Sequence, residues 1–191
     1  MTKYATELME TAKKAKATIE ALQAQKHEAD SAHFNKRITD EVHYETNANI
    51  SKAITEVKTA FYNEMRAQRD SYQAAANKWD TLDAAKLTDD VNLLNSPIKL
   101  GEADYTKLLE KYKDNRTMLR AITDSANANK VEFTVPNGGV LVSAEAKLAA
   151  FDDFSQSVTR GIEDLSSGAS MTFAVMESMT DVSSVDVALD V

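Results

Sequence analysis

Residues 23–37, QAQKHEADSAHFNKR, decide how the first half of this chain folds. On both sides of this stretch, apolar residues recur at the alternating three- and four-residue steps of a helix that packs against a partner. The main apolar positions of this frame are Leu8, Ile19, Leu22, Ile50, Ile54, Val57 and Phe61. Leu22 and Ile50 are 28 residues apart, which is a whole number of heptads, so both stripes share one frame. Between them the frame holds Lys26, His33 and Lys36, and the apolar face disappears.

The first 96 residues contain neither glycine nor proline, the two residues that most strongly interrupt helices. We therefore predict one continuous, coiled-coil-like helix from Thr2 to Leu82, on the order of 120 Å long. In this interpretation the helix changes neighbours at the polar stretch, and Asn47 helps to fix its register. The alternative is a monomeric bundle in which the helix breaks near residues 27–33, with Asp30 and Ser31 as caps.

The rest of the chain predicts shorter elements. A second helix is expected from Glu102 to Asn129, with Asn115 as a polar member of its apolar face. Residues 131–142, VEFTVPNGGVLV, alternate around a Pro-Asn-Gly-Gly turn and predict a small β-hairpin. Ser143 is expected to cap a third helix that ends near Gly168. Residues 171–179 form a short apolar segment to which the pattern assigns no type.

The chain ends with VDVALDV, in which apolar residues alternate with polar or small ones. This spacing predicts a strand-like C-terminal tail. The fold class is therefore mainly α, with a long N-terminal helix, two further helices, a β-hairpin and the tail. We divide the chain into a long helical segment with its connector (1–96), the second helix (97–130), and the hairpin, third helix and acidic tail (131–191).

Charge is distributed unevenly along the chain, whose formal net charge is −8. Residues 1–130 carry equal numbers of basic and acidic side chains, whereas residues 131–191 carry two basic and ten acidic ones. A nucleic-acid partner needs a net basic surface, so we expect no direct binding of nucleic acid. No segment has the roughly 18 apolar residues of a membrane span, and the N-terminus contains no signal peptide pattern, so cytoplasmic expression is expected.

The sequence contains no recognisable motif of catalysis, cofactor binding or metal binding. It has no cysteine, and the spacings between His27, His33 and His43 do not match a metal-binding helix face. We therefore predict no catalytic, cofactor or metal site, and the alternative is an enzyme whose site lacks such motifs. His33 and His43 occupy inward frame positions, so a pH-sensitive contact is a second interpretation of these histidines.

Apolar stripes without an evident partner predict self-association into a homo-oligomer. The residues expected to form its interface are Leu8, Ile19, Leu22, Ile50, Ile54, Val57, Phe61, Tyr105, Leu108, Tyr112, Leu119 and Ile122. A lone strand needs a sheet edge or groove, so the tail is predicted to dock on a partner protein. The docking residues would be Val185, Val187, Leu189 and Val191.

In size, acidity, lack of cysteine and layout, the chain resembles helical structural and assembly proteins of tailed bacteriophages. The features that carry this resemblance are the glycine- and proline-free residues 1–96 and VPNGG at 135–139 with the following tail. It implies a non-enzymatic structural protein that assembles with other structural proteins, in a virion. The acidic C-terminus departs from phage scaffolding proteins, whose capsid-binding segment is commonly basic, and favours a lasting particle component. The alternative is a helical adaptor or secreted effector that recruits a partner through its C-terminal strand.

Overall fold

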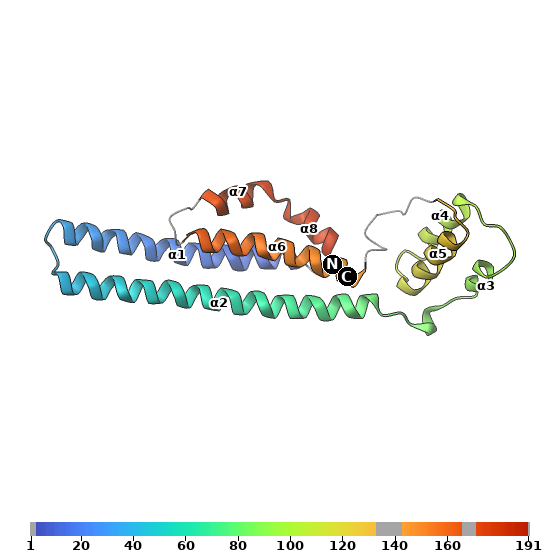
Figure 1. Ribbon diagram of the computed structural model, residues 1–191, viewed down its shortest axis with the longest axis horizontal. Coiled ribbons are helices and arrows are strands. Elements are labelled where there is room, and N and C mark those ends of the chain that lie inside the picture. Colours follow the sequence, from blue (N-terminus) through green and yellow to red (C-terminus); the bar gives the residue numbers. More distant parts are fainter. Residues whose placement is uncertain (1–2, 133–142, 166–170, 191) are drawn as a thin grey trace. The chain divides into compact units, whose positions relative to one another are not determined.

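The computed structural model of the chain describes residues 3–132, 143–165 and 171–190. Every regular element in these ranges is helical, which confirms the prediction of a mainly α protein. The helices are α1 (Tyr4–Phe34), α2 (Asp40–Asp80), the 3-10 turn η1 (Ala84–Lys86), α3 (Asp90–Leu94), α4 (Glu102–Lys111), α5 (Arg116–Ala128), α6 (Ala144–Leu165), α7 (Met171–Met179) and α8 (Val182–Leu189) (Figure 1).

These residues form two compact units. The first, which we call the hairpin unit, contains the residues up to Tyr72 together with Ala149–Asp190. The second, the short-helix unit, contains Gln73–Leu148. The hairpin unit therefore joins the two ends of the chain, and the short-helix unit is built from its middle.

Helices α1 and α2 run antiparallel in the hairpin unit (Figure 1). Near the start of α1, the Thr11 hydroxyl accepts a hydrogen bond of 3.2 Å from Gln68, late in α2. Near the end of α1, Asp30 accepts one of 3.0 Å from Asn47, early in α2. The chain thus reverses between the two helices, and the prediction of a continuous helix from Thr2 to Leu82 is wrong. The alternative of a break near residues 27–33 placed the reversal slightly too early.

Helix α6 packs antiparallel to α2 in the same unit. Arg69 donates two hydrogen bonds, of 2.7 and 2.8 Å, to the carboxylate of Asp152. The rings of Tyr72 and Phe151 stack with their centroids 4.8 Å apart. The side chain of Gln23 in α1 also donates to the backbone carbonyl of Leu165 at the end of α6. The start predicted for this third helix is confirmed, because the backbone N–H of Ala146 donates to the hydroxyl of Ser143 at 3.2 Å.

The apolar stripe of the first two helices forms the core of the hairpin unit. Leu8, Ile19, Ile50 and Phe61 are buried, together with Phe151 and Val158 of α6. Burial of one such side chain stabilises a fold by about 1.5–3 kcal/mol. The apolar stripe therefore packs against other helices of the same chain, because the chain reverses between α1 and α2.

Helices α7 and α8 lie on the hairpin unit as a final layer (Figure 1). In α7, Phe173 is fully buried beside Gly161 of α6, and Lys13 of α1 forms a 2.8 Å ion pair with Glu177. In α8, the carboxylate of Asp186 accepts a 2.7 Å hydrogen bond from the backbone N–H of Ala5.

The predicted strand-like tail is wrong, because residues Val182–Leu189 form helix α8. The alternation of apolar residues fits a strand, but Val182, Val185 and Leu189 also follow the spacing of one helix face. Leu189 is buried and Val182 and Val185 are half-buried on this face. Asp181 starts the helix by accepting hydrogen bonds from the backbone N–H groups of Ser183 and Ser184.

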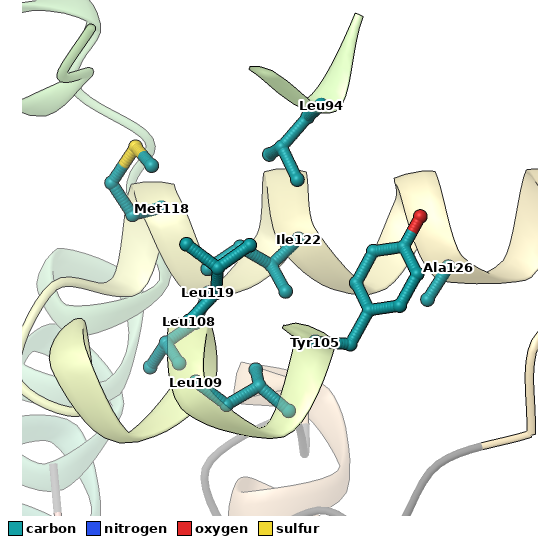
Figure 2. Packing of buried hydrophobic residues seen from close by; sticks show 8 residues of the cluster. All are labelled: Leu94, Tyr105, Leu108, Leu109, Met118, Leu119, Ile122 and Ala126. Atoms are coloured by element: carbon teal, nitrogen blue, oxygen red, sulfur yellow. The ribbon is translucent and has the colours of Figure 1, made fainter. Parts of the chain in front are cut away.

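The short-helix unit is held together by apolar side chains of α3, α4 and α5. Its buried cluster, drawn in Figure 2, consists of Leu94, Tyr105, Leu108, Leu109, Met118, Leu119, Ile122 and Ala126. The prediction of one helix from Glu102 to Asn129 is wrong, since α4 ends at Lys111 and α5 begins at Arg116. Asn115 causes this division: its side chain caps α5 by accepting a 3.2 Å hydrogen bond from the backbone N–H of Met118. The predicted β-hairpin falls largely on residues 133–142, outside the described residues.

Candidate functional site

The tip of the hairpin unit, where α1 gives way to α2, brings together two histidines, two carboxylates and a left-handed lysine. α1 ends in a turn that normally requires glycine. The backbone N–H of Lys36 bonds to the carbonyl of His33, and that of Arg37 bonds to the carbonyl of Ala32, both at 2.9 Å. Lys36 has a φ of 54°, in the left-handed region that L-residues other than glycine rarely adopt. The chain therefore reverses without a glycine, the residue that would have indicated this turn in the sequence.

Helix α2 begins with its own cap directly after this turn. The hydroxyl of Thr39 accepts a 3.4 Å hydrogen bond from the backbone N–H of Val42. Asp40 and Glu41 occupy the first turn, where acidic side chains interact favourably with the helix dipole. Thr39 followed by two acidic residues is the sequence signal of a helix start. The absence of glycine instead favoured a continuous helix, so this signal was not used.

Two histidines lie face to face across the turn. The ring centroids of His33 and His43 are 4.2 Å apart, and the ring planes are inclined by only 10°. Nε2 of His33 lies 2.7 Å from a carboxylate oxygen of Asp40, and Nε2 of His43 lies 2.7 Å from one of Asp30. Each of these pairs joins one helix to the other. The four side chains together tie the end of α1 to the start of α2.

Asn47 adds a third polar group to the contact between His43 and Asp30. Its amide nitrogen is 3.0 Å from Oδ1 of Asp30 and 2.9 Å from Nε2 of His43. Hydrogen bonds from Asn47 and then from His43 hold the pKa of Asp30 below its ordinary value. A ring nitrogen that accepts from Asn47 cannot also donate to Asp30, so the proton on His43 determines which bond forms.

Large apolar side chains are exposed at the same tip. Phe34, the last residue of α1, is 85% exposed, and Tyr44 in α2 is 77% exposed, with Val42 at 46%. Phe34 also lines an open depression, together with Asp30, His33, Lys36, Asp40 and His43. Aromatic side chains such as tyrosine are enriched among the residues that contribute most to protein interfaces. We call Phe34, Val42 and Tyr44 the tip surface.

The residues predicted to mediate self-association are located inside the two units. Leu8, Ile19, Ile50 and Phe61 are buried in the hairpin unit, where Leu22, Ile54 and Val57 are half-buried. Tyr105, Leu108, Leu119 and Ile122 are buried in the short-helix unit, where Tyr112 is half-buried. The buried members of this set are covered by residues of the same chain. Self-association stays a prediction.

The predicted docking residues of the tail do not share one exposed face. In α8, Val187 is 62% exposed, Val185 is half-buried and Leu189 is buried, while Val191 lies outside the described residues. The tip surface was not predicted from the sequence. The signals that identify it are Thr39-Asp40-Glu41 and the aromatic residues on both sides of it.

A second charged cluster lies in the short-helix unit. Arg116 has a side chain only 8% exposed, with Nη2 2.6 Å from Oδ1 of Asp80 and its guanidinium carbon 4.2 Å from the ring centroid of Trp79. Asp80 also accepts a 3.2 Å hydrogen bond from the backbone N–H of Ala144. Burial opposes the ionisation of Asp80, but the bonds from Arg116 and Ala144 outweigh it and lower its pKa. This ion pair between the buried Arg116 and the half-buried Asp80 joins α2, α5 and α6 and has the character of a structural contact.

In the described ranges, no group of three or more histidine, aspartate or glutamate side chains is arranged to hold a metal ion. None of the helices described here is both long and apolar enough to cross a membrane. Comparison of the chain with protein-family models, curated proteins and solved structures found no match.

Proposed function

We propose that this protein is a non-enzymatic structural component of a larger protein assembly, which it joins through the tip surface of the hairpin unit. The observation that carries the proposal is the exposure of Phe34 and Tyr44 on the two sides of one turn. Burial of two aromatic rings is the type of contact that supplies most of the binding energy in protein interfaces.

The position of these rings also favours binding. Both sit on helices whose ends are tied together by the His33–Asp40 and His43–Asp30 contacts. A surface presented on paired helices loses little conformational freedom when it binds, which improves affinity. The partner in this proposal is another structural protein or a second copy of the chain. The resemblance to structural proteins of tailed phages suggests a virion as the setting.

A photo-crosslinking amino acid at position 44 tests this proposal in cells that produce the chain. The matched control places the same crosslinker at position 187, which is exposed in the same unit but away from the tip. Adducts at position 44 with a second copy or with a particle protein, in excess of those at 187, are expected. Equal or absent adducts at the two positions would contradict a role for the tip surface.

A further inference from the structure

The histidine pair at the tip has a property that neither a core contact nor a simple docking surface needs. It places two imidazole rings in contact with each other, each 2.7 Å from a carboxylate of the other helix. The charged groups around the rings are Asp30 from α1, Lys36 from the turn and Asp40 from α2, and Lys26 of α1 acts electrostatically on Asp30. Two carboxylates therefore face the two imidazoles, and the two lysines are additional positive charges.

Protonation changes the balance of forces in this cluster. When both rings are charged, they repel each other and Lys36, but each ring nitrogen lies 2.7 Å from a carboxylate oxygen. Each carboxylate is in direct hydrogen-bond contact with its ring and also attracts the other ring, so the attractions outweigh the repulsions. A proton on Nε2 of His43 also ends its competition between Asn47 and Asp30, because the ring then only donates.

We propose that His33, His43, Asp30 and Asp40 form a proton-controlled clasp, which closes the tip when the imidazoles are charged and the carboxylates are ionised. When the imidazoles are neutral, the contacts change from ion pairs to hydrogen bonds between a neutral ring and a carboxylate, which lack the attraction between opposite charges and are weaker. The clasp is a property of the isolated chain. Only its effect on binding through the tip surface rests on the proposed function.

Hydrogen exchange of the purified chain tests the clasp without any partner. Backbone amides of residues 34–43 are compared at about pH 5.5 and about pH 8, on either side of the imidazole pKa. The variant His33→Asn/His43→Asn removes both imidazoles and corrects for the intrinsic effect of pH on exchange. Relative to this variant, the wild-type tip should be about two- to fivefold better protected at the lower pH, the scale of exposed ion pairs.

Two single substitutions complete the test. His27→Asn alters an exposed histidine of α1 outside the pair. It should leave the ratio of tip protection at low pH to that at high pH as it is in wild type. Asp40→Asn keeps both histidines but removes one ion pair, so the ratio should fall. An equal ratio in wild type and double variant, or better protection at high pH, would overturn the clasp. Phe34→Ser separates the two proposals, because it should abolish docking while the pH-dependent protection persists.

Discussion

The carboxylate of Asp186, five residues before the end of the chain, accepts a 2.7 Å hydrogen bond from the backbone N–H of Ala5, at the start of the first helix. It also accepts from the backbone N–H and the hydroxyl of Thr6. The residue before α1, Lys3, provides no side-chain cap, so a helix distant in sequence supplies the acceptor that a local residue usually provides. Helix α8 thereby fixes the last described segment of the hairpin unit to the start of α1.

Replacement of Asp186 by alanine should destabilise the hairpin unit by about 1–2 kcal/mol, the usual loss when a helix cap is removed. Three hydrogen bonds disappear, and the buried N–H group of Ala5 loses its acceptor. Urea unfolding followed by circular dichroism measures the change. Glu10→Gln, at an exposed position of α1, is the control and should have almost no effect.

Lys36→Gly should stabilise the hairpin unit by about 0.5–1 kcal/mol, because glycine adopts the left-handed backbone of Lys36 without the steric strain of a side chain. Lys26→Gly, in the interior of α1, should have the opposite sign and a similar size. Thermal unfolding of the two variants provides the comparison. Destabilisation by both substitutions would mean that residue 36 does not have a left-handed conformation.

The sequence predicted the composition of the core better than the course of the chain. The frame that includes Leu8, Ile19, Ile50 and Phe61 is a buried face, but heptad spacing is the same whether the partner helix belongs to another chain or follows in the same one. Absence of glycine was a poor guide to helix continuity, because Lys36 and Lys130 both adopt left-handed conformations at helix ends. Asn115, interpreted as a polar seam residue, acts as a cap.

The candidate site could be predicted only in part. His33 and His43 share the inward frame, which suggested a pH-sensitive contact, but ten residues along a continuous helix would separate them by about 15 Å. Only the reversal at the tip brings their rings together and places Asp30 and Asp40 beside them. The prediction of a strand-like tail failed for another reason. Val182, Val185 and Leu189 have helical spacing, but the same segment also alternates in polarity, so its pattern fits a helix and a strand equally well.

Gly161→Ala should weaken the packing of α7 on α6, although alanine is the better helix former. A Cβ atom at position 161 would lie 2.9 Å from Cδ2 and 3.5 Å from Cα of Phe173. Such overpacking costs about 1–3 kcal/mol, against a gain in helix propensity of about 1 kcal/mol. The double variant Gly161→Ala/Phe173→Leu makes room for the methyl group and should recover part of the loss. Additive effects of the two substitutions in urea unfolding would contradict this contact.

Asp80→Asn should destabilise the short-helix unit by about 2–3 kcal/mol at neutral pH, because it leaves the buried charge of Arg116 without its carboxylate. The folded-state pKa of Asp80 is lowered, so its stabilisation is present above the ordinary carboxyl pKa of about 4 and is lost as pH falls through the lower folded value. Stability should therefore decrease more steeply in wild type than in Asp80→Asn as the solution is acidified. Asp114→Asn, at an exposed position of the same unit, should behave like wild type.

The reversal of the chain at residues 35–39 is the basis of this account, because it makes the apolar stripe internal and creates the tip. Spin labels at Lys14 and Asn63, both exposed, test it directly by pulsed electron-electron distance measurement. In an antiparallel hairpin the two packed helices lie about 10 Å apart, so the labels should be less than about 30 Å from each other. A continuous helix would separate these positions by about 73 Å at 1.5 Å per residue. A distance below about 30 Å is the result predicted here, and one near 70 Å would contradict it.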